Sequence, residues 1–200
     1  MTGYLLLNML FHPTKVLEDL SNENTATMAS LGRYSILILL LPPLFSWMGG
    51  SKLGWRLGGS EPVFFDTTGS IVFSFFYFFI LSIGFVGTVY ISRCMATTYD
   101  AKISASLHLS LFTVICAPLV AASLAHLYPD VFFNVLVFVP ALIWSITLLY
   151  KGLPIALGIS PEQGLLMASS LVGWLLVAAV SLLGLSVSLW TNGARTLLGL

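Results

Sequence analysis

Long apolar runs separated by isolated charges dominate the pattern of this 200-residue chain. A charged side chain at the centre of a bilayer costs about 3 kcal/mol even on a lenient insertion scale, so charges mark the ends of membrane-spanning segments. Several of the uncharged runs reach the roughly 20 residues that a helix needs to cross the hydrocarbon core. The pattern predicts five transmembrane helices, at approximately residues 29–49, 67–92, 104–128, 131–150 and 162–190.

The first predicted span is the least regular, because Pro42 and Pro43 lie near its far end. It reaches spanning length only if the helix begins near Ala29 and continues through both prolines. Membrane helices can contain proline when other groups bond to the backbone carbonyls that lose their partner. The other four runs need no such allowance. We therefore predict an all-α membrane protein, a bundle of five transmembrane helices over residues 29–200.

The segment before this bundle, residues 1–28, is too short in its apolar part to cross a membrane. Helical spacing separates it into an apolar face and a charged face. The apolar face contains Val16, Leu17 and Leu20, and the charged face contains Lys15, Glu18 and Asp19. We expect a short interfacial helix on the cytoplasmic leaflet that serves as an anchor packed against the bundle, because its acidic residues disfavour the alternative, a lipid-targeting role.

Composition agrees with a membrane protein and excludes other classes. Hydrophobic residues make up 58% of the chain and charged residues 8%, whereas a soluble domain carries about 25% charged residues. Eight basic and eight acidic residues give a net charge of zero, so no basic surface is available for nucleic acid. The bilayer is the partner that the composition predicts.

The distribution of Lys and Arg predicts the orientation. With five spans the two termini lie on opposite sides. The side of the N-terminus carries five basic residues, Lys15, Arg33, Arg93, Lys102 and Lys151, and the other side carries three, Lys52, Arg56 and Arg195. We expect a cytoplasmic N-terminus and an outside C-terminus in a multi-pass protein of a bacterial inner membrane.

Residues that could bind a metal or take part in catalysis are scattered along the sequence. Cys94 and Cys116 lack the spacing of a metal pair, and His12, His108 and His126 are separated by whole helices or lie on opposite sides of the predicted bundle. No hydrolase, metalloprotease or phosphate-binding motif is present in the sequence. We expect no catalytic residue, no metal site and no cofactor.

Two prolines fall inside predicted spans, Pro118 in the third and Pro140 in the fourth. Each removes a backbone donor and crowds the carbonyl four residues earlier, at Val114 and Leu136. Such positions form hinges in transporters, and they also occur where proline serves packing alone. Pro118 and Pro140 are therefore candidate hinge residues.

The segment from Tyr150 to Gln163 is expected to turn on the cytoplasmic side. Gly152 can adopt the left-handed conformation that ends a helix, and Pro154 should prevent the helix from continuing. The apolar residues that follow are too few to cross the bilayer, so they must bury against lipid, the bundle or a partner. The candidate partner-binding residues are Tyr150, Gly152, Leu153, Pro154, Leu157 and Gly158; the alternative is a tightly packed connector.

Helix starts are marked by capping residues. Ser160 and Gln163 have the spacing of a capping box, with Pro161 at the first helical position, so the fifth span should begin there. Asp66 and Asp130 precede apolar runs in the way that N-cap residues do.

Three stretches resemble a known family: FHPTKVLEDLSNEN, APLVAASLAHLYP and LLYKGLPIALGISPEQGLLMASS. In their order and spacing they are similar to the Yip family, specifically its small bacterial inner-membrane branch. The resemblance implies a five-helix bundle with a cytoplasmic N-terminus. Eukaryotic members engage prenylated GTPases, but the Asp-Leu-Tyr-Gly-Pro motif that they carry before the first span is missing here, so the resemblance indicates the fold more than the activity.

Two functions remain as hypotheses. The first is a non-enzymatic inner-membrane protein that organises membrane or recruits protein partners at the cytoplasmic face. The second is a small transporter or channel component, which is suggested by the prolines and by polar residues of the second span, Ser74, Tyr77, Ser82 and Thr88. Rows of small residues, such as Ala117, Ala121 and Ala125, would serve packing and homo-oligomer formation equally well.

Overall fold

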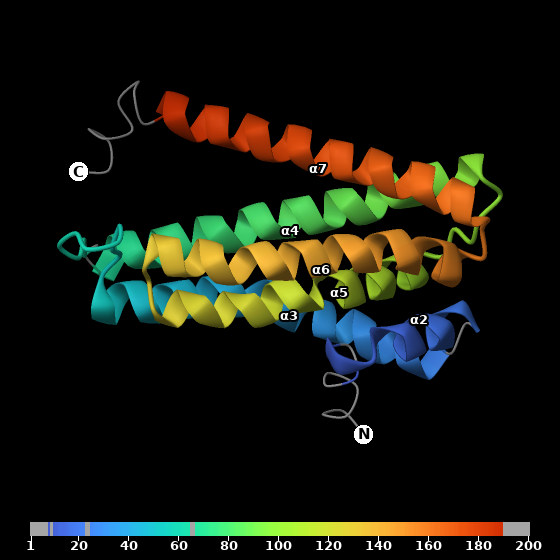
Figure 1. Cartoon of the computed structure of the whole chain (residues 1–200), viewed down its shortest axis with the longest axis horizontal. Helices are drawn as coiled ribbons and strands as arrows, with labels where there is room; N and C mark the ends of the chain where they lie inside the picture. Colours follow the sequence, from blue (N-terminus) through green and yellow to red (C-terminus); the bar gives the residue numbers. More distant parts are fainter. Residues whose placement is uncertain (1–7, 9, 23–24, 65–66, 190–200) are drawn as a thin grey trace.

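Long helices and a short helix near the N-terminus make up the part of the fold that the structure describes (Figure 1). The computed structural model describes residues 8, 10–22, 25–64 and 67–189. The α-helices are α2 (Pro13–Ser21), α3 (Thr25–Leu53), α4 (Thr67–Thr98), α5 (Ala105–Ala122), α6 (Val131–Leu157) and α7 (Pro161–Leu189). A 3₁₀ helix, η1 (Ser123–Leu127), extends α5. Five helical segments are long and apolar enough to cross a membrane, which confirms the predicted fold class.

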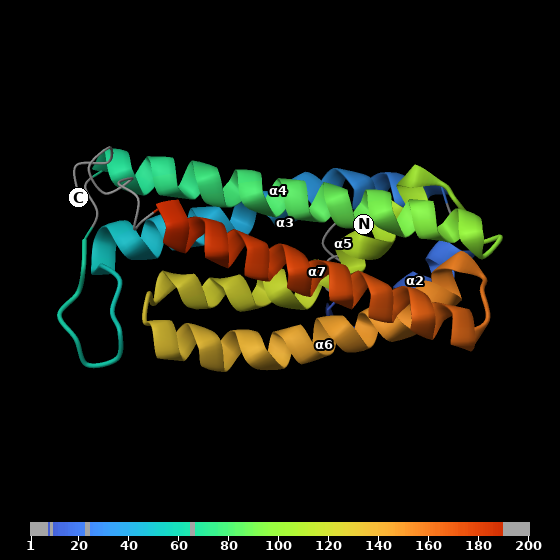
Figure 2. The ribbon, with the colours of Figure 1, turned by 90° about the horizontal axis from the view of Figure 1, so that it is seen from above.

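The centre of the bundle is α5, which packs against α3, α6 and α4. Two thirds of the most apolar stretch of α5 and η1 is buried (67%), against 11% for α4 and 17% for α6 and α7. Figures 1 and 2 show α7 lying over α4 and α6, on the side away from α2. The outer helices therefore present apolar faces that suit contact with lipid.

The two ends of the bundle differ. At one end, here called the α2 end, α2 packs against α5 and α6 close to the α6–α7 turn (Figure 1). At the other, here called the loop end, the connection from α3 to α4 extends beyond the helices (Figure 2). The backbones of Trp55 and Val63 pair within this connection, and Arg56 pairs with the segment around Asp130.

Proline does not end the helices where it occurs. Pro42 and Pro43 lie buried within α3, which runs unbroken to Leu53. In α5, Pro118 is followed after Ala122 by the 3₁₀ turn η1, and α6 contains Pro140 and Pro154. Each ring removes one backbone donor. Around Pro118 the apolar turns of α5 are buried, and that burial offsets the loss, whereas Pro140 lies on an exposed part of α6.

The prediction that the chain turns at Gly152 and Pro154 is wrong. Helix α6 continues through both residues to Leu157, and the left-handed residue that ends it is Gly158, with φ of 70°. The Gly158 amide donates to the carbonyl of Pro154 over 3.1 Å. The helix continues because the turn after Pro154 buries Ala156 and Leu157, and such burial outweighs one missing hydrogen bond.

A substitution in α3 tests the packing at the loop end. A methyl group at Gly49 would overlap the backbone carbonyl of His126 in η1, whereas one at Gly32 of the same helix would make ordinary contact with Leu109, at 3.6 Å. Gly49→Ala should therefore lower the thermal unfolding temperature in detergent, and Gly32→Ala should leave it unchanged or raise it slightly. Equal melting temperatures for the two variants would contradict this packing.

Candidate functional site

Helix α2 is held at the bundle by its apolar face. Val16, Leu17 and Leu20 are buried, and α2 contacts α5 and α6. A Cβ at Gly152 would lie 3.1 Å from Leu17 and 3.3 Å from Leu111, so the absence of a side chain there makes room for this approach. Gly152 is thus a packing position and not the turn residue that was expected. Helix α2 therefore packs against the bundle through its apolar face.

The residues expected to face a partner are mostly inside the bundle. Leu153 and Leu157 are 0% and 1% exposed, and Pro154 lies against Gly164 of α7, where a Cβ would come within 2.8 Å. The Tyr150 hydroxyl bonds to Ser169 of α7 over 3.0 Å. Only Gly158 of the six is exposed. Their placement corresponds to the packed connector, since the side chains join α6 to α7 and α2.

Two predicted helix caps are present. The Ser160 hydroxyl accepts from the Gln163 amide over 3.2 Å, and the Gln163 side chain accepts from the Ser160 amide over 3.1 Å, which is a complete capping box. Asp130 accepts from the Phe133 amide over 2.9 Å. Both caps are confirmed, and they start α7 and α6. The cap expected at Asp66 lies outside the described residues.

A serine and a histidine meet near the α2 end. His108 Nε2 lies 2.9 Å from the carbonyl oxygen of Lys102, so Nε2 carries the hydrogen, and Nδ1 accepts from the Ser92 hydroxyl over 2.9 Å. The Lys102 ammonium donates in turn to the carbonyl of Ser21 at the end of α2, over 2.6 Å. The sequence analysis did not identify Ser92, 16 residues away, as a partner of His108.

The Ser92–His108 pair has the order of a nucleophile, a base and an orienting acceptor. Both side chains are fully buried, at 0% exposure, which leaves no approach for a substrate. Their bonds instead join α4 to α5, and Lys102 links this junction to α2. The arrangement supports a role in holding the helices together.

A second polar cluster lies near the loop end. The His126 ring bonds through Nδ1 to the Asn134 side-chain oxygen over 2.6 Å and through Nε2 to the Tyr77 hydroxyl over 3.3 Å. The Asn134 amide donates to the carbonyls of Tyr128 and Asp130. Since Asn134 offers an acceptor, His126 donates through Nδ1 and accepts at Nε2. This cluster joins α4, η1 and α6.

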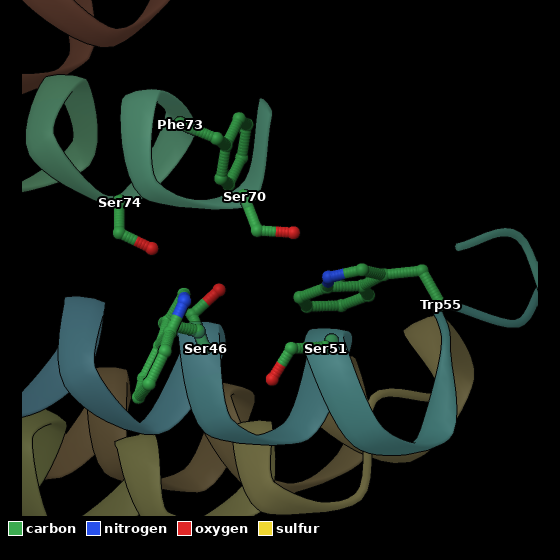
Figure 3. A pocket seen from close by; sticks show the side chains of 8 residues that line it. Ser46, Ser51, Trp55, Ser70, Phe73 and Ser74 are labelled. Atoms are coloured by element: carbon green, nitrogen blue, oxygen red, sulfur yellow. The ribbon is translucent and has the colours of Figure 1, made fainter. Parts of the chain in front are cut away.

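The polar residues of the second span do not converge. Ser82 and Thr88 bond to carbonyls of their own helix, each over 2.7 Å, while Tyr77 faces His126. Ser74 lies between α3 and α4 in a crevice (Figure 3), and its buried hydroxyl has no hydrogen-bond partner among the residues that the structure describes. The four side chains thus have separate surroundings, which gives no support to a shared polar pathway.

That crevice is lined by hydroxyl and aromatic groups. Figure 3 shows Ser46 and Ser51 from α3 opposite Ser70 and Ser74 from α4, with the Trp55 ring at one side. The Trp55 indole lies directly over Gly50, where a Cβ would come within 2.8 Å. No group of three metal-ligating side chains occurs among the described residues.

The two candidate hinge prolines have different surroundings. Pro118 is buried in the central helix, whereas Pro140 is exposed on the outside of α6. They therefore do not share one packed joint, and a hinge at either position stays a prediction.

Removal of the Ser92 hydroxyl tests the junction at the α2 end. Ser92→Ala would leave His108 Nδ1 buried without a donor, which costs about 1–3 kcal/mol. Ser82→Ala in the same helix loses only a bond to its own backbone and should have a smaller effect. Thermal unfolding of both variants in detergent measures the difference; a Ser92→Ala variant as stable as Ser82→Ala would refute the role of the junction.

Comparison with known proteins identifies relatives over almost the whole chain. The family model of the Yip1 domain matches residues 7–191. The inner membrane protein YohC of Escherichia coli K12 is 26% identical over 185 residues, which covers 92% of this chain and 94% of the relative. The YohC protein of the O6:H1 strain gives the same identity and coverage. No solved structure matches.

Proposed function

This chain belongs to the Yip1 domain family of membrane proteins, and on that premise we propose that it is a non-enzymatic protein that organises an inner membrane or recruits protein partners to it. The matched relatives are called inner membrane proteins, and five segments of the chain are apolar and long enough to span a bilayer. These findings support the location, and the role is inferred from the site.

The observation that carries the proposal is the two-faced docking of α2. Its apolar side chains are buried on the bundle, while Lys15, Glu18 and Asp19 are exposed. Lys151 of α6 and Glu162, in the first turn of α7, are also exposed. A charged surface supported by rigid helices suits recognition of a protein partner, because charges at a surface guide and select association.

The hydrogen bonding of the bundle supports a non-enzymatic role. Its two histidine clusters each satisfy both ring nitrogens with groups from the bundle itself. A general base must reach a substrate proton, and these rings are already engaged and buried. Their chemistry is used to join helices.

A photo-crosslinking amino acid at Glu18 tests partner recruitment. In native membranes we expect one discrete protein adduct from this position. The charge reversals Lys15→Glu and Asp19→Lys should abolish that adduct, because they invert the surface without touching the buried face of α2.

The matched control places the same crosslinker at Ser60, which is exposed at the loop end. The Glu18 adduct should be missing there. Identical adducts from both positions, or adducts at Glu18 that survive charge reversal, would refute recruitment by the α2 surface.

We further propose that the α2 end is cytoplasmic, as the distribution of basic residues indicates. Cys94 is exposed near this end of α4. In a Cys116→Ser background, a membrane-impermeant maleimide added to intact spheroplasts should leave Cys94 unlabelled and should label it after lysis. A cysteine at Ser60 in a chain without Cys94 should show the opposite result, and labelling of Cys94 from outside would reverse the orientation.

A further inference from the structure

A pocket at the loop end combines a cation, an anion and an aromatic ring. It is lined by Leu53, Gly54, Arg56, Tyr128, Pro129 and Asp130. We propose that it binds the headgroup of a phospholipid that carries a phosphate and a primary amine, the phosphatidylethanolamine class. The proposal does not depend on the function proposed above.

The backbone brings the two opposite charges to the same place. The Arg56 amide donates to the carbonyl of Pro129 over 2.9 Å, and the Val131 amide donates to the carbonyl of Arg56 over 3.0 Å. This parallel bridge sets Arg56 beside Asp130 although 74 positions separate them in the sequence. Gly54, with φ of 70°, turns the chain out of α3 into this bridge.

Each charged group has the chemistry of one half of the headgroup. A guanidinium presents a planar set of donors that matches phosphate oxygens. The Asp130 carboxylate accepts one bond from Phe133, and a carboxylate has capacity for further donors such as an ammonium group. The half-exposed Tyr128 ring adds a face suited to a cation.

The position of the pocket fits a lipid in the bilayer. It lies where α3 ends, where η1 ends and where α6 begins, which is the level at which membrane helices meet headgroups. Leu53, Leu127 and Val131 are exposed around it, at 44%, 38% and 37%. These side chains provide an apolar surface for acyl chains attached to a bound headgroup.

Native mass spectrometry of the full-length protein released from nanodiscs tests the proposal. The nanodiscs would contain equimolar phosphatidylethanolamine, phosphatidylcholine and phosphatidylglycerol. We expect the wild type to retain roughly tenfold more of the ethanolamine lipid than of the choline lipid, because a quaternary ammonium donates no hydrogen bond to Asp130.

Two variants test separately the contacts to the phosphate and to the amine of the headgroup. Arg56→Gln should reduce retention of the ethanolamine and choline lipids about tenfold, since both lose the phosphate contact. Asp130→Asn keeps an N-cap residue, so α6 should still start normally, but ethanolamine retention should fall to the choline level. Lys52→Gln and Glu61→Gln change exposed charges at the same end and should retain lipid as the wild type does.

Equal retention of the three lipids by the wild type would overturn the proposal, as would Arg56→Gln or Asp130→Asn behaving like the two controls. Circular dichroism of each variant, together with the milder Arg56→Lys, separates lost binding from lost folding; a folded Arg56→Lys should retain an intermediate amount. A last experiment measures the binding of soluble phosphoethanolamine. Binding of this ester without retention of any phospholipid would assign the pocket to a soluble ligand and refute the lipid.

Discussion

Buried polar side chains around the central helix must find hydrogen-bond partners on neighbouring helices, and much of this bundle depends on that requirement. Lipid chains and apolar side chains offer these groups no hydrogen bond. A buried polar group without a partner lowers stability by more than a paired one raises it. Thr113 of α5 lies 2.7 Å from the Ser35 hydroxyl of α3, and Ser110 donates to the carbonyl of Met28. With the His108 and His126 clusters, such bonds determine which helices adjoin α5 and at what rotation.

Glycine allows close approach between helices at several contacts of the bundle. Glycine at positions 49, 152 and 164 leaves room for η1, for Leu17 of α2 and for Pro154 of α6, respectively. The helix backbones approach closely because glycine has no side chain. The close approach increases dispersion contacts, which matter in a membrane because the hydrophobic effect between helices is weak there. Gly152 shows how a residue that is typical of turns can instead serve packing in the middle of a helix.

The two ends of the bundle have different chemistry and suit different partners. At the α2 end, an apolar helix face is buried and charged side chains remain exposed on a firm support. At the loop end, a bridge between distant segments places Arg56 and Asp130 around one pocket. We propose a protein as the partner of the first surface and a lipid headgroup as the ligand of the second.

The sequence by itself determined the class of protein, the five apolar segments and the caps at Asp130 and Ser160, because charge spacing and capping are local properties. It also indicated the apolar face of α2. It misplaced the end of α6, since whether a helix continues past Pro154 depends on what the following turn buries. Only the tertiary structure paired Ser92 with His108 and Arg56 with Asp130. Those contacts depend on the rotation and depth of separate helices, which cross-helix hydrogen bonds and glycine contacts determine and local sequence patterns do not encode.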